Sequence, residues 1–267
     1  SMTTTQRLQI EGQLRKISLF PAVSTETFSL EAPGLEDLRS DWERFIGSFD
    51  TKVRQKISAA LPVVQQFSSQ MRLQNWSGNV VWGDDYSVVG FLAPGESQFG
   101  IAVDIGTTKI AAFLVDLTNG ETISQAGAMN PQIAYGEDVV SRIAYGNQDE
   151  TSRQTLQTRL IETLNELTAD LCQAQEIKTD QLTDFVVVGN TAMHHLFAGL
   201  PVRQLGEAPY VAAVRQAITF PAKDVGLIGA PDAKVYLPPN IAGFVGADHV
   251  AMLLASDLQN RPGISIA

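Results

Sequence analysis

The segment from Asp104 to Lys109 carries the clearest chemistry in the sequence. It reads Asp-Ile-Gly-Thr-Thr-Lys and lies between two apolar runs. Gly106 lets the backbone turn tightly and approach a ligand. Consecutive N–H groups in such a turn, together with the hydroxyls of Thr107 and Thr108, can hold a phosphate. Asp104 can bind Mg²⁺ through water, and Lys109 can add positive charge beside the phosphate. The alternative is a hairpin whose polar residues only satisfy the turn.

Strands are expected on both sides of this turn, which separates it from a P-loop, where the turn opens a helix. The apolar runs and the Asn119-Gly120 turn signal predict an antiparallel meander of three strands over about 100–104, 110–117 and 121–129. Apolar spacing predicts the later elements. These are helices over about 137–145, 156–171 and 247–257, and strands at 185–188, 235–237 and 263–267.

Asn190 and Asp248 are two further candidates. Asn190 follows a buried strand at a Gly-Asn turn, and strand ends often line clefts in α/β sheets. The alternative role for Asn190 is a cap at the entry of the next helix, and Thr191 can also cap that helix. Asp248 follows Gly246-Ala247 at an expected helix start, where it either caps the helix or faces a cleft and orients water. Asp104 and Asp248 are therefore the candidate catalytic carboxylates.

The remaining titratable residues have simpler explanations. His194 and His195 are adjacent, so on a helix they point about 100° apart, and a zinc site is not expected there. Cys172 is the single cysteine and lies on the apolar stripe of a helix, which favours buried packing. One cysteine excludes an internal disulfide and an all-cysteine metal site within one chain. Glu137 and Asp138 are expected in the first turn of a helix, where negative charge suits the helix dipole.

The first 98 residues predict a small α+β module without a catalytic constellation, best interpreted as a structural or docking domain. An extended stretch covers Lys16 to Pro21, and a second helix is expected over about 50–61, ending at Pro62. Two runs, 80–82 and 88–91, predict a hairpin. The first helix is expected from apolar residues at helical spacing: Leu35, Leu38, Trp42, Phe45 and Ile46.

Composition narrows the function classes. The 267 residues are 44% hydrophobic and 18% charged, which is ordinary for a globular protein. With 19 basic and 29 acidic residues, the net charge of −10 argues against nucleic-acid binding. No apolar run approaches the roughly 20 residues of a membrane span, and the N-terminus lacks the apolar core of a signal peptide. We expect a cytoplasmic protein without a nucleic-acid or membrane partner.

The order of strand, phosphate turn, strand, Asn-Gly turn, strand and helix resembles the first phosphate-binding hairpin of the actin-like ATPase superfamily. Four blocks narrow this resemblance: 130–132, 135–143, 189–196 and 243–248. Together they resemble the reductive activators of corrinoid proteins, which serve methyltransferase systems. The resemblance implies an α/β fold, with a middle or docking domain over 1–98. The first lobe of an actin-like, ribonuclease H-like ATPase follows over 99–267, with a mixed sheet and flanking helices.

In that family an iron–sulfur domain supplies an electron, and ATP drives it onto cobalt, taking Co(II) to Co(I). ATP binding favours one conformation and hydrolysis resets it. The resemblance thus implies ATP and Mg²⁺ as cofactors, with phosphate contacts from Gly106, Thr107, Thr108, Lys109 and Asn190. The implied partners are a corrinoid protein and an electron donor to a [2Fe-2S] domain, and a homodimer stays open. The chain lacks that domain's cysteines and ends where the second lobe's phosphate turn should begin. We therefore expect a fragment that holds half an ATP cleft and is inactive alone.

Three other functions remain open. A small-molecule kinase of the acetate or sugar kinase type keeps the phosphate turn but leaves the first 98 residues without a role. A dehydratase activator clamps an iron–sulfur cluster through cysteines, and the single Cys172 argues against it. A non-catalytic scaffold with a vestigial nucleotide site is the third.

Overall fold

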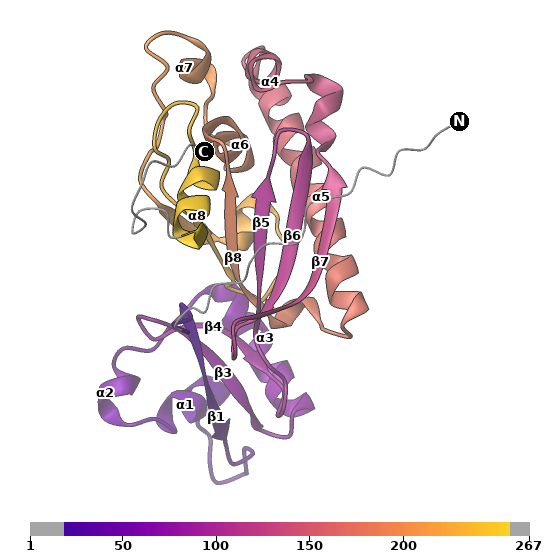
Figure 1. The fold of residues 1–267 in the computed structure, drawn as a ribbon. Coiled ribbons are helices and arrows are strands. Elements are labelled where there is room, and N and C mark those ends of the chain that lie inside the picture. The colour runs from indigo at the N-terminus through magenta and orange to yellow at the C-terminus, as the bar shows by residue number, and fades with distance from the viewer. Residues whose placement is uncertain (1–18, 257–267) are drawn as a thin grey trace.

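The computed structural model describes residues 19–256, and two β-sheets organise this part of the chain. The first sheet has four strands in the order β1-β3-β4-β2, and the second has six in the order β7-β6-β5-β8-β10-β9. Figure 1 shows the first sheet with its helices below the second sheet. The elements of the first part are β1 (Val23–Ser29), α1 (Asp41–Gly47), α2 (Thr51–Arg54), β2 (Ser58–Ala59), α3 (Leu61–Leu73), β3 (Ser77–Gly83) and β4 (Ser87–Leu92).

The second part begins with β5 (Phe99–Ile105), β6 (Lys109–Asp116) and β7 (Glu121–Met129). A 3-10 helix (Pro131–Tyr135), α4 (Val139–Gly146), α5 (Glu150–Ala174), β8 (Leu182–Gly189), α6 (Thr191–Phe197) and α7 (Arg203–Gly206) follow. The last elements are β9 (Ile218–Pro221), β10 (Lys234–Leu237) and α8 (Ala247–Ser256), with short 3-10 helices at Thr179–Gln181 and Ala222–Val225. None of the helices within residues 19–256 combines the length and the apolar character needed to cross a bilayer.

Aromatic side chains form the core of the first part. Phe45 is fully buried, and its ring centroid lies 5.3 Å from that of Phe28, 5.3 Å from Phe67 and 5.1 Å from Phe91. The predicted hairpin is confirmed, because β3 and β4 pair antiparallel. β1 was not predicted; its sequence is largely polar and exposed, and it pairs antiparallel with β3.

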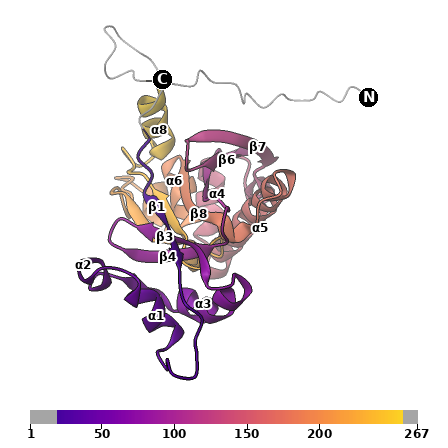
Figure 2. The ribbon, with the colours of Figure 1, turned by 90° about the horizontal axis from the view of Figure 1, so that it is seen from below.

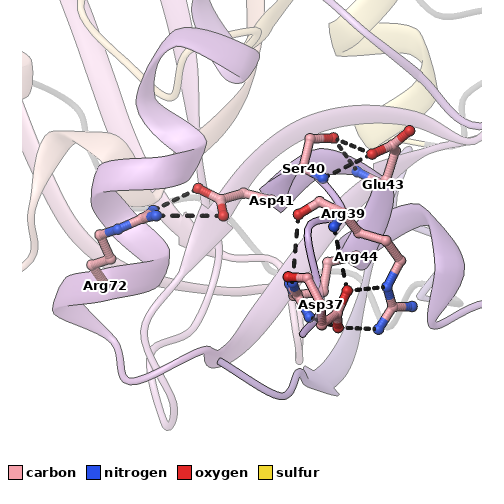
Figure 3. A network of polar contacts seen from close by, with 7 residues as sticks. All are labelled: Asp37, Arg39, Ser40, Asp41, Glu43, Arg44 and Arg72. Carbon is pink, nitrogen blue, oxygen red and sulfur yellow. Dashed lines mark hydrogen bonds and ion pairs between the residues drawn. The ribbon is translucent and has the colours of Figure 1, made fainter. Parts of the chain in front are cut away.

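The prediction that Leu35 and Leu38 lie on the buried face of the first helix is wrong. Their side chains are 99% and 89% exposed, and α1 begins only after Ser40. The Ser40 hydroxyl accepts from the N–H of Glu43, whose carboxylate accepts from the N–H of Ser40, so this capping box sets the helix start. Figure 3 shows this box beside Asp37.

Asp37 holds the segment before α1 in place. It accepts hydrogen bonds from Arg39 and from the buried Arg44, whose Nη1 lies 2.5 Å from Oδ2 (Figure 3). Both guanidinium groups lower the pKa of the Asp37 carboxyl well below its usual range. A polar network, which apolar spacing cannot predict, therefore fixes residues 37–44.

The predicted helix over about 50–61 is also wrong. The structure has the short α2, then β2, and Pro62 stands in the first turn of α3 instead of ending a helix. Proline suits that position because its fixed φ is helical and its missing N–H would have had no partner there. Of the extended stretch predicted from Lys16 to Pro21, residues 16–18 lie outside the described residues, and 19–21 precede β1.

The six-stranded sheet confirms the predicted α/β class. β5, β6 and β7 form the antiparallel meander, β8 pairs parallel with β5, β10 pairs parallel with β8, and β9 adds an antiparallel edge that was not predicted. The predicted long leucine helix is α5. Asp138 caps α4 through Ser141, so Glu137 precedes that helix rather than lying in its first turn. Residue 257 of the last predicted helix and the strand predicted at 263–267 lie outside the described residues.

The two faces of this sheet have different surroundings. Val103, Phe185 and Val187 are buried in one core with the leucines of α5. Side chains alternate along a strand, so Asp104 and Asp184 lie on the opposite face, where α8 contacts β8. Figure 1 shows α8 in front of β8 and α5 behind the meander, and Figure 2 gives the view from below. This second face carries the candidate chemistry.

Asp184 lies on the second face, in a cavity of about 570 Å³ that Asp84, Asp85 and Lys234 also line. Burial raises the pKa of Asp184 from 3.8 to about 6. A raised carboxyl pKa means that the charged form is disfavoured in the folded state, so the cost appears as pH rises from about 4 to 6 and is complete above it. We expect Asp184→Asn to increase the free energy of unfolding at pH 7.5 by about 1–2 kcal/mol.

Urea denaturation at two pH values tests this expectation. The gain from Asp184→Asn should shrink as the pH falls from 6 towards 4, where the wild-type carboxyl is protonated in the folded state. Asp84→Asn, at an exposed position on the same cavity, is the matched control and should change little. An equal gain at both pH values would contradict the burial of this carboxylate.

Candidate functional site

The turn between β5 and β6 brings the predicted phosphate residues to one end of the sheet. Asp104 stands next to the end of β5, Gly106 to Thr108 form the turn, and Lys109 opens β6. A Cβ at Gly106 would lie 2.6 Å from the carbonyl oxygen of Lys109, so the turn leaves no room for a side chain there. Thr108 and Asp104 are exposed, whereas Thr107 and Lys109 are half-buried. The polar groups therefore face solvent from a tightly closed hairpin.

Asn130 holds this turn from the far side. Its buried side-chain Nδ2 donates to the carbonyl oxygen of Gly106 at 2.8 Å, and its backbone N–H donates to that of Thr108 at 2.9 Å. Its Oδ1 accepts from the N–H of Gln132 and so starts the 3-10 helix. Asn130 was not among the predicted site residues. An Asn-Pro pair directly after a strand is the sequence feature that could have drawn attention to Asn130. The turn that Asn130 contacts lies more than 20 residues earlier, so no local pattern links the two.

A buried arginine contacts the same methionine sulfur as Asn130. Arg142 on α4 is fully buried, and its Nε donates to the carbonyl oxygen of Gly136 at 2.9 Å. Its Nη1 lies 3.5 Å from Sδ of Met193, and Nδ2 of Asn130 lies 3.7 Å from the same sulfur. Burial lowers the pKa of this guanidinium from its usual value. Arg142 thus packs α4 and α6 together behind the turn.

Of the two roles that the sequence left open for Asn190, the structure shows the helix cap, and the phosphate contact stays a prediction. Its Oδ1 accepts from the N–H groups of Ala192 and Met193, both at 3.1 Å, so Asn190 caps α6. Its Nδ2 donates to Oγ1 of Thr107 at 3.2 Å, which joins this cap to the phosphate turn. The prediction that Thr191 caps the helix is wrong, because its hydroxyl donates to the carbonyl oxygen of Ala242 at 2.6 Å.

The segment before α8 packs directly on this cap. A Cβ at Gly246 would collide with the carbonyl oxygen of Gly189 and would lie 2.6 Å from Cα of Asn190. The backbone of Gly246 therefore lies against the end of β8. This close approach places the start of α8, which carries Asp248, at the end of β8. β8 pairs with β5, the strand that carries Asp104.

The negative charge of Asp248 acts on Asp104. Asp104 is an exposed residue, but the surrounding chain removes part of the water from its carboxyl group, which raises its pKa, and the negative charge of Asp248 raises it further. Asp248 lies inside the first turn of α8, and its Oδ1 accepts from the N–H and Nδ1 of His249, at 2.8 and 3.0 Å. A cation between the two carboxylates would relieve their repulsion.

The oxygen ligands of this pair suit magnesium. Within residues 19–256 no three His, Cys, Asp or Glu side chains gather as a metal-binding group. Two carboxylates are nevertheless compatible with Mg²⁺, which keeps several waters and takes few protein ligands beside a phosphate. Cys172 is buried, and burial raises the pKa of its thiol to about 11, which fits packing and not reactivity.

Comparisons with known proteins identify the family. The family described as the RACo middle region matches residues 99–261, and the RACo linker region matches residues 12–98. The chain belongs to the RACo family. Residues 1–98 were expected to resemble a middle domain, and most of them instead match the model of the RACo linker region.

Two named relatives agree with this assignment to the RACo family. The corrinoid activation enzyme RamQ of Eubacterium limosum is 34% identical over 195 residues, covering 72% of this chain and 33% of RamQ. The [Co(II) methylated amine-specific corrinoid protein] reductase of Methanosarcina barkeri is 26% identical over 178 residues, covering 63% of this chain and 32% of that protein. The chain thus spans about a third of the length of the curated relatives it matches.

A solved structure extends the likeness to the fold. The structure of a reductive activator for corrinoid, iron-sulfur protein matches with a TM-score of 0.74 and 29% sequence identity. The match covers 94% of this chain and 41% of that one. The arrangement of both sheets is therefore that of a reductive activator.

Proposed function

We propose that this chain serves in a longer, ATP-dependent reductive activator that takes the cobalt of a corrinoid protein from Co(II) to Co(I). The titles of the two curated relatives, a corrinoid activation enzyme and a Co(II) corrinoid protein reductase, support this reaction. The observation that carries the proposal is the turn of Gly106 to Thr108, held by Asn130 and Asn190.

Within this proposal, residues 99–267 form the first lobe of an actin-like ATPase, and the phosphates of ATP bind at the turn. The N–H groups of Gly106 to Thr108 and the hydroxyl of Thr107 contact phosphate, and Lys109 adds positive charge. Asp104 holds hydrated Mg²⁺, which supplies charge neutralisation at the phosphates. Asp248 orients the attacking water, a role supported by the contact of α8 with β8 and by the charge of Asp248 acting on Asp104.

The electron comes from a [2Fe-2S] domain of the longer protein. The given chain cannot hold such a cluster by itself, because its single cysteine, Cys172, is buried. One electron passes to one Co(II) centre. ATP binding and hydrolysis supply the coupling by favouring one arrangement of the activator and its partner. Residues 1–98 act as the docking module, and a second lobe outside the chain completes the ATP cleft.

Hydrolysis assays with the full-length protein test this proposal. We expect ATP hydrolysis to rise several-fold when the Co(II) corrinoid protein and a reductant are added, with Co(I) appearing in the visible spectrum. Stimulation by a small carboxylate or sugar acceptor instead, with phosphate transferred to it, would favour the kinase. Hydrolysis that neither addition changes would favour the third alternative, a non-catalytic scaffold with a vestigial nucleotide site.

A further inference from the structure

Two adjacent histidines on α6 have no part in the proposed chemistry, although both are buried. His195 is fully buried, and His194 is 2% exposed. Nδ1 of His195 lies 2.7 Å from the carbonyl oxygen of Thr191, and its Nε2 lies 3.0 Å from the backbone nitrogen of Ala213. These contacts reach from the cap of α6 to a segment 18 residues further along the chain.

The hydrogen bonds assign the tautomer of His195. The Ala213 N–H can only donate, so Nε2 carries the lone pair. The proton therefore lies on Nδ1, which donates to the carbonyl oxygen of Thr191. Burial lowers the pKa of both histidines, that of His194 to about 4, so both rings are neutral at physiological pH. His195 is then a fixed acceptor for one backbone N–H.

That N–H belongs to the segment 207–217, which links α7 to β9 without helix or strand. The segment packs against the residues before α8. The N–H of Asn240 donates to the carbonyl oxygen of Arg215 at 2.9 Å, and the rings of Tyr210 and Phe244 lie 5.9 Å apart. A Cβ at Gly243 would collide with the carbonyl oxygen of Tyr210. Backbone therefore lies on backbone along this contact.

The contacts continue from there to the candidate site. Gly246 lies against Gly189 and Asn190, and Asn190 bonds to Thr107. α8 follows directly and carries Asp248. The 207–217 segment thus stands behind the loop 241–246, and His195 ties that segment to α6, the same helix that Asn190 caps.

We propose that His195 is a positioning residue for Asp248 and Asn190, acting by fixing the 207–217 segment behind the loop 241–246. The functional part of this inference rests on the proposed nucleotide site. Without the acceptor at Nε2, the Ala213 N–H loses the hydrogen bond that ties this segment to α6. The loop can then move away from the end of β8, and Asp248 moves with it.

Two substitutions separate the two nitrogens of His195. In His195→Gln the side-chain oxygen can reach the place of Nε2, so the bond to Ala213 is kept. In His195→Asn the amide nitrogen can take the place of Nδ1, so the bond to Thr191 is kept and the acceptor for Ala213 is lost. Asparagine is one methylene shorter than glutamine, so His195→Asn also loses more packing at this buried position. Thermal unfolding of both variants measures that difference and checks that both are folded.

The measurements are amide exchange without nucleotide, by mass spectrometry of peptides covering 207–217 and 240–248, and the KM and kcat for Mg-ATP, all in the full-length protein. For His195→Asn we expect faster exchange in both peptides and a KM for Mg-ATP raised by about tenfold. His195→Gln should stay close to wild type in both readouts.

Equal changes in the two variants would overturn the inference, because packing would then be the cause. Faster exchange in 207–217 alone, with 240–248 unchanged, would also overturn it. If the wild type hydrolyses Mg-ATP but His195→Asn leaves its KM unaltered, positioning of the site is excluded. If the wild type shows no hydrolysis, the proposed function fails. Faster exchange in 240–248 for His195→Asn, and not for His195→Gln, would still support the inference that His195 fixes the loop 241–246 through the 207–217 segment.

Discussion

Replacing Asp104 with asparagine is expected to lower Mg-ATP hydrolysis by the full-length protein about 100-fold or more. The physical reason is the loss of the carboxylate that we propose holds hydrated Mg²⁺ beside the turn of Gly106 to Thr108. Asparagine has nearly the same shape, so the hairpin geometry set by Gly106 and Asn130 should persist. Steady-state hydrolysis over a range of Mg²⁺ concentrations measures the effect.

The same substitution should not weaken the fold, which makes the test specific. Burial and Asp248 raise the pKa of Asp104, so its charged form is disfavoured in the folded protein. Removing the charge relieves that cost above the raised pKa and has no such benefit below the unfolded value. Thermal unfolding of Asp104→Asn at pH 7.5 should therefore match or exceed wild type. Glu121→Gln, exposed on β7 of the same sheet, is the control for hydrolysis. Unchanged hydrolysis in Asp104→Asn would remove Asp104 from the site.

Replacing Gly246 with alanine is expected to have the second large effect. The new Cβ would collide with the carbonyl oxygen of Gly189, which is backbone and cannot rotate away. The loop before α8 must shift, so we expect a loss of about 1–3 kcal/mol in the free energy of unfolding. Asp248 would shift with α8, and Mg-ATP binding by the full-length protein should weaken about tenfold or more.

Gly34→Ala is the matched control for this substitution. Gly34 has no atom near the position of a new Cβ, and its backbone does not require glycine. Denaturant unfolding and Mg-ATP binding should both stay near wild type there. If Gly246→Ala unfolded and bound nucleotide like Gly34→Ala, the close packing of α8 on the end of β8 would be refuted.

Five of the six strands of the larger sheet could be predicted, because apolar runs and turn signals define them, whereas the short edge strand β9 was missed. The stripe of α5 and the buried run of β8 leave little choice of structure. The first part was harder, because local polar chemistry decided it. The capping box at Ser40 and the helix-starting Pro62 overruled the apolar spacing of Leu35 and Leu38.

The candidate site divides in the same way. The turn from Asp104 to Lys109 was visible in the sequence, because its residues are consecutive. The clamp from Asn130 joins two turns of the chain, and the contact of Gly246 with Asn190 joins residues more than 50 positions apart. Such contacts depend on the packing of α6 and α8 around β8, which no local pattern encodes. The role of His195 was hidden for the same reason, since its partner Ala213 lies in a segment without regular structure.

The most direct test of the account is calorimetric titration of Mg²⁺ with a non-hydrolysable ATP analogue into the full-length protein and its Asp104→Asn variant. We expect saturable binding by the wild type at one site and binding weakened by at least about tenfold in the variant. Equal affinity in the two proteins, or no binding by the wild type, would contradict the claim that the turn after β5 is a nucleotide site.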